Sequence, residues 1–403
     1  MPKTIALIGA LDTKGADFAF VNGEIERRGH QTLVIDAGVV GEPGIQADVP
    51  AAEVAEAGGT SLEDLRAKQD KALAMETMTK GIAAVVKELH DKGQIDGVLA
   101  MGGSAGTAIG TAAMRALPIG VPKVMVSTVA AGDTQAYCGT KDVVLIPSVV
   151  DVAGVNRISA PIYANAAGAV CGMVEAEPPA IEEKPLLAAS MFGNTTPIVT
   201  RCCETMARHG YETLVFHCTG TGGRTIESLV AEGYLDGVLD ITTTEWADEV
   251  CGGVFSAGPT RGDAAAAAGI PQVIVPGCVD MANFWAPETV PAKYEGRTFY
   301  QWNPNVTLMR TTREENIAIG RLLAEKANAA TGPVALLLPL KGVSMLDAPG
   351  KEFWHPEADH ALFDAIKANV RDDIPVVEMD HNVNDEEFAD AVTAKLLEFL
   401  KET

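Results

Sequence analysis

The groups best suited to chemistry in the first half of the chain directly follow stretches that read as buried strands. Asp12, Thr13 and Lys14 follow the apolar run 4–10. A lysine at the start of a helix is repelled by the positive end of the helix dipole, and a bound anion would reverse that cost. Helix amides, the Thr13 hydroxyl and the Lys14 ammonium would then converge on a phosphate. A solvated lysine in a tight turn explains the same pattern equally well.

A glycine-rich loop follows the next candidate strand, 97–101. Glycines let backbone amides approach a phosphate closely, and a strand before the loop with a helix after it, here 107–116, is the setting such loops need. The spacing matches neither a P-loop nor a dinucleotide fingerprint, and a glycine turn that only packs a helix is the alternative. Hydroxyls after the strand 123–126 can bond phosphate or ribose, or form a turn. The candidate nucleotide-binding residues are Asp12, Thr13, Lys14, Gly102, Gly103, Ser104, Gly106, Thr107, Ser127 and Thr128.

The second half carries different chemistry at the equivalent strand ends. His217 is a candidate base and Glu245 a candidate acid or base. Arg261 and the amides of a glycine-rich loop would favour a small anionic ligand. Each of these groups could instead be a satisfied structural polar residue, and no spacing of ligands is diagnostic of a metal. The candidate residues for the second ligand are Asn194, Thr195, Thr196, Thr219, Gly220, Thr221, Gly222 and Gly223, beside the candidate catalytic residues His217, Glu245 and Arg261.

The elements that position these groups are duplicated along the chain. Three short matches occur in the same order in both halves: 29–36 with 210–217, 96–99 with 236–239, and 120–126 with 269–275. The first match lies 67 residues before the second in the first half, but 26 residues before it in the second half. The first half therefore carries about 41 extra residues, within which 62–90 reads as one long helix.

Each half reads as an α/β unit in which apolar, β-branched strands alternate with helices. Such runs are typical of parallel strands covered on both faces. The proline- and acid-rich stretch 175–185 suits a boundary. We predict two Rossmann-like parallel-sheet lobes related by internal duplication: a nucleotide-binding lobe, 1–180, and a second lobe, 181–403, with a second ligand site. Ligands of such sheets bind beyond the carboxyl ends of the strands.

Composition narrows the classes of partner. The chain has 403 residues, 47% of them hydrophobic, and a net charge of −23, which opposes binding to nucleic acid or to an anionic membrane. The seven cysteines are odd in number and lack C-x-x-C spacing, as expected for free thiols in a reducing compartment. No signal peptide or run of about 20 apolar residues is evident. We expect a cytoplasmic protein.

Taken together, the motifs resemble one family. GALDTKG, GGSAGT, HCTGTGG, SAGPTR, GIPQVIVPGCVDMANF and LPLKGVSMLD are similar to the bacterial family related to the ATP-binding inhibitory domain of the plant tobamovirus-resistance protein. The resemblance covers nearly the whole chain. It implies two Rossmann-like lobes, Mg-ATP in the amino-terminal lobe and a homodimer. In the plant protein this domain binds a viral replication protein, an activity that we do not transfer.

Three hypotheses of function follow. The first is an ATP- and Mg-binding protein that takes a second small anionic ligand in the cleft between the lobes. The second is a metabolic enzyme that acts on a small phosphorylated or carboxylated metabolite through residues of the second half of the chain, such as His217, Glu245 and Arg261. The third is a regulatory binding module without turnover. The sequence leaves open whether the protein is an enzyme.

Overall fold

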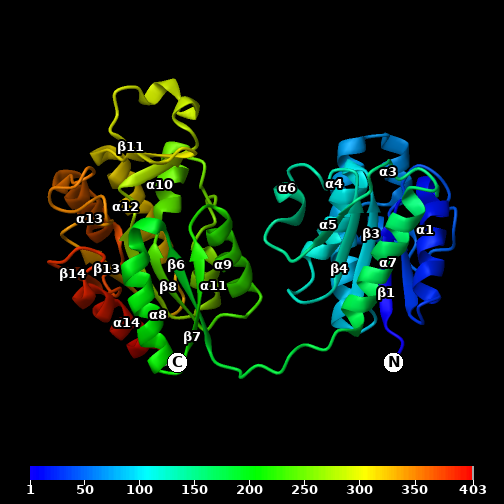
Figure 1. Cartoon of the computed structure of the whole chain (residues 1–403), viewed down its shortest axis with the longest axis horizontal. Helices are drawn as coiled ribbons and strands as arrows, with labels where there is room; N and C mark the ends of the chain where they lie inside the picture. Colours follow the sequence, from blue (N-terminus) through cyan, green and yellow to red (C-terminus); the bar gives the residue numbers. More distant parts are fainter. Residues whose placement is uncertain (402–403) are drawn as a thin grey trace. The chain divides into compact units, whose positions relative to one another are not determined.

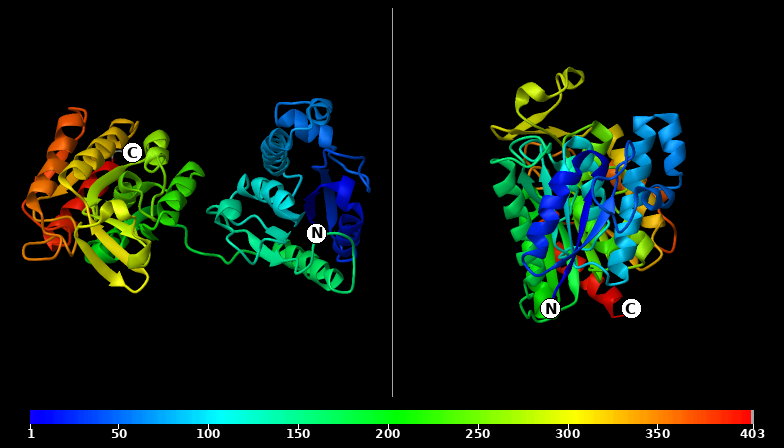
Figure 2. Two further views of the ribbon diagram at one scale, coloured as in Figure 1. Left: turned by 90° about the horizontal axis from the view of Figure 1, so that it is seen from above. Right: turned by 90° about the vertical axis from the view of Figure 1, so that its right-hand side faces the viewer.

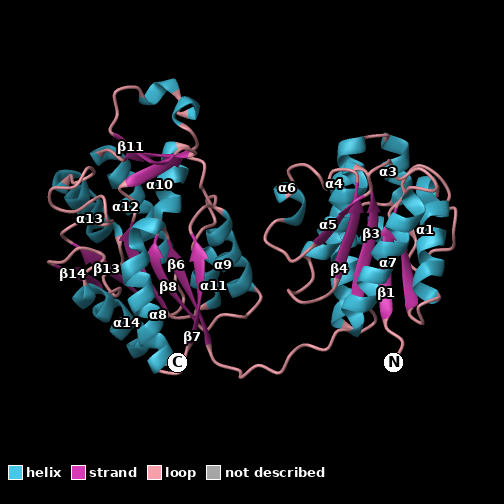
Figure 3. Ribbon diagram, in the orientation of Figure 1, coloured by secondary structure: helices cyan, strands magenta, loops and turns pink. Residues whose placement is uncertain are grey.

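The computed structural model describes residues 1–401, which form two compact units, 1–180 (unit 1) and 181 onward (unit 2) (Figure 1). Each unit is a parallel β-sheet covered by helices (Figure 3). The predicted α/β class with two Rossmann-like parallel-sheet lobes is therefore confirmed. Among the described residues, no helix combines the length and the apolar composition that crossing a bilayer requires.

Unit 1 contains a five-stranded parallel sheet in the order β2-β1-β3-β4-β5. Its strands are β1 (Thr4–Gly9), β2 (Gln31–Asp36), β3 (Gly97–Gly102), β4 (Lys123–Ser127) and β5 (Val144–Pro147). Its helices are α1 (Leu11–Glu26), α2 (Ala51–Ala57), α3 (Leu62–Lys68), α4 (Lys71–Asp91), α5 (Ser104–Arg115), α6 (Gln135–Cys138) and α7 (Ser159–Glu175). Helices α1 and α7 pack together on one face, and α2, α4 and α5 cover the other (Figure 2).

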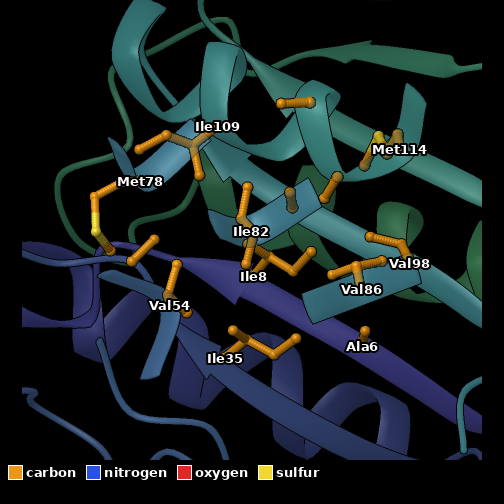
Figure 4. Packing of buried hydrophobic residues seen from close by; sticks show 14 of the residues in the cluster. Ala6, Ile8, Ile35, Val54, Met78, Ile82, Val86, Val98, Ile109 and Met114 are labelled. Carbon is orange, nitrogen blue, oxygen red and sulfur yellow. The ribbon is translucent and has the colours of Figure 1, made fainter. Parts of the chain in front are cut away.

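The core under α4 and α5 joins these helices to the sheet. Ile82 of α4 and Ile109 of α5 belong to the same buried cluster as Ile8 of β1 (Figure 4). Ile82 is 0% exposed. Burying such a side chain stabilises the fold by about 1.5–3 kcal/mol. The apolar packing therefore holds α4 and α5 over the carboxyl end of β1.

Unit 2 contains a six-stranded parallel sheet in the order β14-β13-β9-β8-β6-β7 and a small antiparallel sheet, β10-β12-β11. Its strands are β6 (Leu186–Met191), β7 (Glu212–His217), β8 (Gly237–Thr242), β9 (Gln272–Gly277), β10 (Met281–Phe284), β11 (Phe299–Asn303), β12 (Val306–Arg310), β13 (Val334–Pro339) and β14 (Val376–Met379). Its helices are α8 (Thr196–Arg208), α9 (Thr221–Ala231), α10 (Thr244–Cys251), α11 (Asp263–Ala268), α12 (Arg313–Asn328), α13 (Pro356–Asn369) and α14 (Glu386–Leu400).

The internal duplication is confirmed by topology. Read from the other edge, the unit 2 order β7-β6-β8-β9-β13 repeats β2-β1-β3-β4-β5 element for element. Individual hydrogen bonds repeat as well. The Ala37 amide donates to the Gly9 carbonyl at 2.8 Å, and Cys218 donates to Met191 at 2.8 Å. Equivalent positions in the two units can therefore be compared directly.

The prediction of one long helix over 62–90 is wrong. The segment forms two helices, α3 and α4, separated at Gln69, whose φ of 51° lies in the left-handed region. Asp70 then caps α4 by accepting hydrogen bonds from the Ala72 and Leu73 amides at 2.9 and 3.1 Å. The composition of this segment favours a helix throughout, so it gave no sign of the break. An aspartate that interrupts such a segment can cap a new helix with its side chain, as Asp70 does.

Candidate functional site

A cavity of about 710 Å³ opens in unit 1 at the carboxyl ends of β1 and β2 and the start of α5. In the order β2-β1-β3, the connections after β1 and β3 leave on opposite faces of the sheet. This reversal makes the crevice beside β1 the ligand position expected for an open parallel sheet. The volume is that of a site for a small organic molecule or cofactor.

The walls of the cavity are mainly apolar. Ile8, Ala37, Leu65, Met78 and Ile109 line it from the sheet and from three helices. Leu65 and Met78 belong to α3 and α4, which the extra residues of the first half supply. The insertion that breaks the symmetry of the duplication therefore builds the outer wall of the cavity.

One end of the cavity is formed by the first turn of α5, where Ala105 and Gly106 line it. The first amides of α5 have no partner within the helix, and Gly103, the residue before the helix, has no side chain that could cap them. A Cβ on Gly102 would lie 2.8 Å from the Gly106 Cα. Glycine is thus required for this close turn, whose amides and dipole favour an anion. The helix begins at Ser104, three residues before the predicted start.

Two carboxylates tie the loop after β2 to the start of α1. Asp12 Oδ2 accepts hydrogen bonds from the Val40 and Gly41 amides at 2.9 and 3.0 Å, whereas its buried Oδ1 has no protein partner. Asp36 Oδ1 accepts from Leu11 at 3.0 Å, and burial raises the pKa of Asp36. Asp12 lines the cavity, and its buried Oδ1 is a carboxylate oxygen that no protein donor satisfies.

Two cations at the cavity were not predicted. Arg66 donates to the carbonyls of Val39 and Gly41, both at 2.8 Å, and so braces the loop after β2. Lys71, at the start of α4, is exposed and lines the cavity. No ion pair of Lys71 is found among the described residues. The extra 41 residues of the first half were the only feature of the sequence that pointed to this segment. The segment contains no glycine-rich motif that would have predicted a binding role.

The structure brings only some of the predicted nucleotide-binding residues to the cavity. Asp12, Thr13 and Gly106 line the cavity. The Lys14 ammonium instead contacts the Val152 carbonyl and is not part of the lining. Ser127 is wholly buried and its hydroxyl lies 2.6 Å from that of Thr107.

The Ser127 and Thr107 pair therefore fastens β4 to α5 behind the cavity, because both hydroxyls are spent on each other and on backbone groups. Both side chains are buried, so the prediction that either hydroxyl contacts a ligand directly does not agree with this structure. Thr128 is exposed beside Gly103. Its predicted role, with those of Ser104 and Lys14, stays a prediction.

In unit 2 the predicted anion site already holds an anion. Glu245 Oε1 accepts hydrogen bonds from the Gly220 and Gly223 amides at 2.8 and 3.0 Å. Its Oε2 accepts from Arg261 Nε at 2.8 Å. Arg261 also binds both carboxylate oxygens of Asp240, at 2.6 and 3.0 Å. Burial alone would lower the pKa of Arg261, but Asp240 and Glu245 raise it well above its usual value.

The prediction that Arg261 and these amides take an anionic group from a ligand therefore needs correction. The groups do select an anion, but it is the side chain of Glu245. Arg261 is 2% exposed and Glu245 is 1% exposed. Neither is therefore placed to exchange a proton with a ligand.

The other candidates of unit 2 differ in exposure. Asn194 and Thr195 are buried, and the Thr195 hydroxyl lies 2.7 Å from that of Thr242. Thr196 and His217 are exposed. The His217 ring lies against Phe192, with centroids 5.1 Å apart, and this partial loss of contact with water lowers the pKa of His217.

The glycine turn below His217 is tight, since a Cβ on Gly222 would lie 2.1 Å from the His217 carbonyl oxygen. Thr219 and Thr221 belong to the same turn. Their predicted contact with a second ligand stays a prediction.

Sequence reasoning missed a buried charge cluster in unit 2. Arg310 donates to Asp359 Oδ1 at 2.7 Å and lies 3.5 Å from Asp347. Asp280 accepts a hydrogen bond from the Ser344 hydroxyl at 2.8 Å. Burial and then repulsion by Asp347 raise the pKa of Asp280 to about 7 and that of Asp359 to about 8.

Asp280 follows β9, Asp347 lies in the segment between β13 and α13, and Asp359 lies in α13. No local motif therefore reveals that they meet. Among the described residues, no cluster of three histidine, cysteine or acidic side chains is arranged to hold a metal. The cluster is a place where protons are retained inside unit 2.

The fold is that of a duplicated α/β protein with a cavity at the carboxyl end of its first sheet. The chain belongs to the family described as uncharacterised protein family UPF0261. The amino-terminal domain of that family matches residues 3–179 and its carboxy-terminal domain matches residues 184–400.

Relatives occur in bacteria and in a plant. A UPF0261 protein of Clostridium tetani is 52% identical over 403 residues, which is all of both chains. A UPF0261 protein of Rhizobium meliloti is 43% identical and covers 97% of this chain and 98% of its own. The ToMV resistance protein Tm-1(GCR237) of Solanum lycopersicum is 43% identical over 81% of this chain and 45% of its own length. The resemblance stated from the motifs is therefore confirmed.

Proposed function

We propose that unit 1 binds a nucleotide, ATP with Mg²⁺, in the cavity beside β1. The observation that carries the proposal is a cavity of about 710 Å³ with apolar walls, closed at one end by the glycine-rich first turn of α5. Apolar walls suit a nucleobase and exposed helix amides suit phosphates. The identity of the nucleotide comes from the family resemblance.

The residues present fit such a ligand. The amides at Ala105 and Gly106 would hold phosphate oxygens, and Lys71 would add a positive charge. Mg²⁺ is held in proteins by one or two carboxylates together with the phosphates of its nucleotide. The unpartnered Asp12 Oδ1 would serve as such a carboxylate, or would accept a hydrogen bond from a ribose hydroxyl.

Titration calorimetry with Mg-ATP tests the proposal, with a matched pair of variants on α4. Lys71→Ala should weaken binding by about 1–2 kcal/mol, the range for a charged hydrogen bond at a partly exposed site. Lys80→Ala is the control because Lys80 is exposed on the same helix and does not line the cavity. Equal losses in both variants, or no heat from the parent protein, would reject this site.

Lys14→Ala separates the sequence prediction from the structure. The sequence predicts a loss of about 1–3 kcal/mol in binding. The contact of Lys14 with the Val152 carbonyl leads us to expect a smaller loss than that of Lys71→Ala. A larger loss would place the Lys14 ammonium on the phosphates.

We favour a protein that binds the nucleotide in unit 1 and has no catalytic activity in unit 2. Glu245 and Arg261, two of the candidate catalytic residues, are buried and bonded to each other. Incubation of the protein with Mg-ATP should therefore release no more phosphate than buffer does. Turnover that disappears in His217→Ala would instead favour a metabolic enzyme. On the basis of the family resemblance we also propose that the protein is cytoplasmic and forms a homodimer. Sedimentation equilibrium tests the oligomeric state.

A further inference from the structure

Glu245 occupies the place that a bound anion takes at a helix start. It lies in the first turn of α10, after β8, and accepts hydrogen bonds from amides at the start of α9, after β7. Helices α9 and α10 are labelled in Figure 1. Strand β6 lies between these two strands in the sheet. A Cβ on Gly223 would come within 2.1 Å of Glu245 Oε2. The glycine therefore leaves room for an oxyanion, and Glu245 fills that room.

The duplication identifies the equivalent place in unit 1. Strands β3 and β8 occupy the same position in their sheets and begin at Gly97 and Gly237. Counting the same distance from each, Glu245 corresponds to Ala105. Ala105 lines the cavity, at the end where the first amides of α5 lie. These are the equivalents of the α10 amides, whereas Glu245 is bonded to those of α9. One unit thus has a methyl group and an open cavity where the other has a carboxylate.

The surroundings of Glu245 are complete without a ligand. Its two oxygens accept three hydrogen bonds, and the guanidinium beside it is shared with Asp240. A tethered carboxylate avoids the loss of translational freedom that a diffusing anion must overcome. An external phosphate would also meet the charges of Asp240 and of Glu227, whose carboxylate lies 3.9 Å from Arg261.

We propose that unit 2 contains a second small-oxyanion site, formed by the Gly220 and Gly223 amides and Arg261, which Glu245 closes from within. Removal of the carboxylate should open this site to a small carboxylate or phosphate. The equation of Glu245 with the phosphate of a nucleotide rests on the proposed function. The oxyanion site itself does not.

Chemical rescue tests the site. Glu245→Ala should lower the melting temperature, because Arg261 and two amides lose their partner. Formate, tried beside inorganic phosphate, should raise the melting temperature of this variant by about 3–5 °C more than that of the parent. Sodium chloride at equal ionic strength controls for screening. The double variant Glu245→Ala with Arg261→Met should lose the rescue. Equal effects of formate on parent and Glu245→Ala would overturn the proposal.

A second variant decides the matter if Glu245→Ala does not fold. Ala105→Glu places the carboxylate in the open cavity of unit 1 and should weaken Mg-ATP binding at least about tenfold, because like charges repel. Ala105→Gln, of equal size without the charge, should weaken it less. Equal binding by Ala105→Glu and the parent would refute the equivalence. If the parent itself does not bind Mg-ATP, the proposed function fails, and formate rescue is repeated on Glu245→Ser, whose short side chain vacates the carboxylate position, to decide the oxyanion site.

Discussion

The buried carboxyl groups around Arg310 should make unit 2 less stable as the pH rises from about 4 to 8. Asp359 has an ordinary pKa of 3.8, which burial and Asp347 raise to about 8. The unfolded chain therefore loses this proton near pH 4, while the native protein keeps it until about pH 8. Within that window the native state binds more protons, so the free energy of unfolding falls by about 1.4 kcal/mol per pH unit for each retained proton.

Asp359→Asn isolates the contribution of one carboxyl group. The asparagine oxygen can still accept the bond from Arg310, and its amide nitrogen can face Asp347 as a protonated carboxyl would. Between pH 5 and 7 the parent should lose about 1–3 kcal/mol more stability than the variant. All four tryptophans lie in unit 2, so their fluorescence during urea unfolding follows this unit alone.

Asp364→Asn is the control for this experiment, since Asp364 is exposed on the same helix, α13. It should leave the pH profile of the parent unchanged. Parallel profiles for the parent and Asp359→Asn would refute the reasoning, because they would show that Asp359 holds no proton above its ordinary pKa.

Three further variants test the architecture. Gly102→Ala should abolish Mg-ATP binding, because its methyl group would lie 2.8 Å from the Gly106 Cα. Calorimetry with Gly172→Ala is the control, because a Cβ there meets no atom within 4 Å and Gly172 does not line the cavity; unchanged binding by Gly102→Ala would contradict the close turn. Ile82→Ala should destabilise unit 1 by about 2–5 kcal/mol in urea unfolding followed by circular dichroism; a loss below 1 kcal/mol would mean that α4 packs loosely. Thr312→Ala removes the capping box of α12 and should cost unit 2 about 1 kcal/mol by tryptophan fluorescence. Thr298→Ala is the control, because Thr298 is exposed and lies outside the helices of unit 2.

The sequence predicts the repeated sheet because each strand is encoded locally. An apolar, β-branched run such as 4–10 signals a buried parallel strand by itself, and the ordered matches between the halves signal the duplication. Asp12 and Gly106, which lie in the first helical turn after a strand and line the cavity, could be proposed from the sequence for the same reason. Lys71 and Met78 could not, because only tertiary packing brings the insertion over the end of β1.

Residue type alone also failed to separate a residue that meets a ligand from one that is already satisfied. Ser127 and Arg261 have the chemistry of ligand-binding groups, yet each is buried with protein partners. The decisive quantity is the exposure of the polar atom, which depends on neighbours distant in the sequence. The cluster of Asp280, Asp347 and Asp359 escaped prediction for the same reason.

The two units show how one architecture gives two outcomes at the carboxyl end of its sheet. The backbone of each presents open helix amides, and such amides require an acceptor when buried. In unit 2 the chain supplies the acceptor itself through Glu245. In unit 1 the amides of Val40 and Gly41, after the equivalent strand β2, donate to Asp12. The position of Glu245 is held there by Ala105, and the insertion carrying α3 and α4 encloses the space beside it. A carboxylate of the chain therefore satisfies amides after this strand in both units, and Ala105 in place of a glutamate leaves space for the cavity in unit 1.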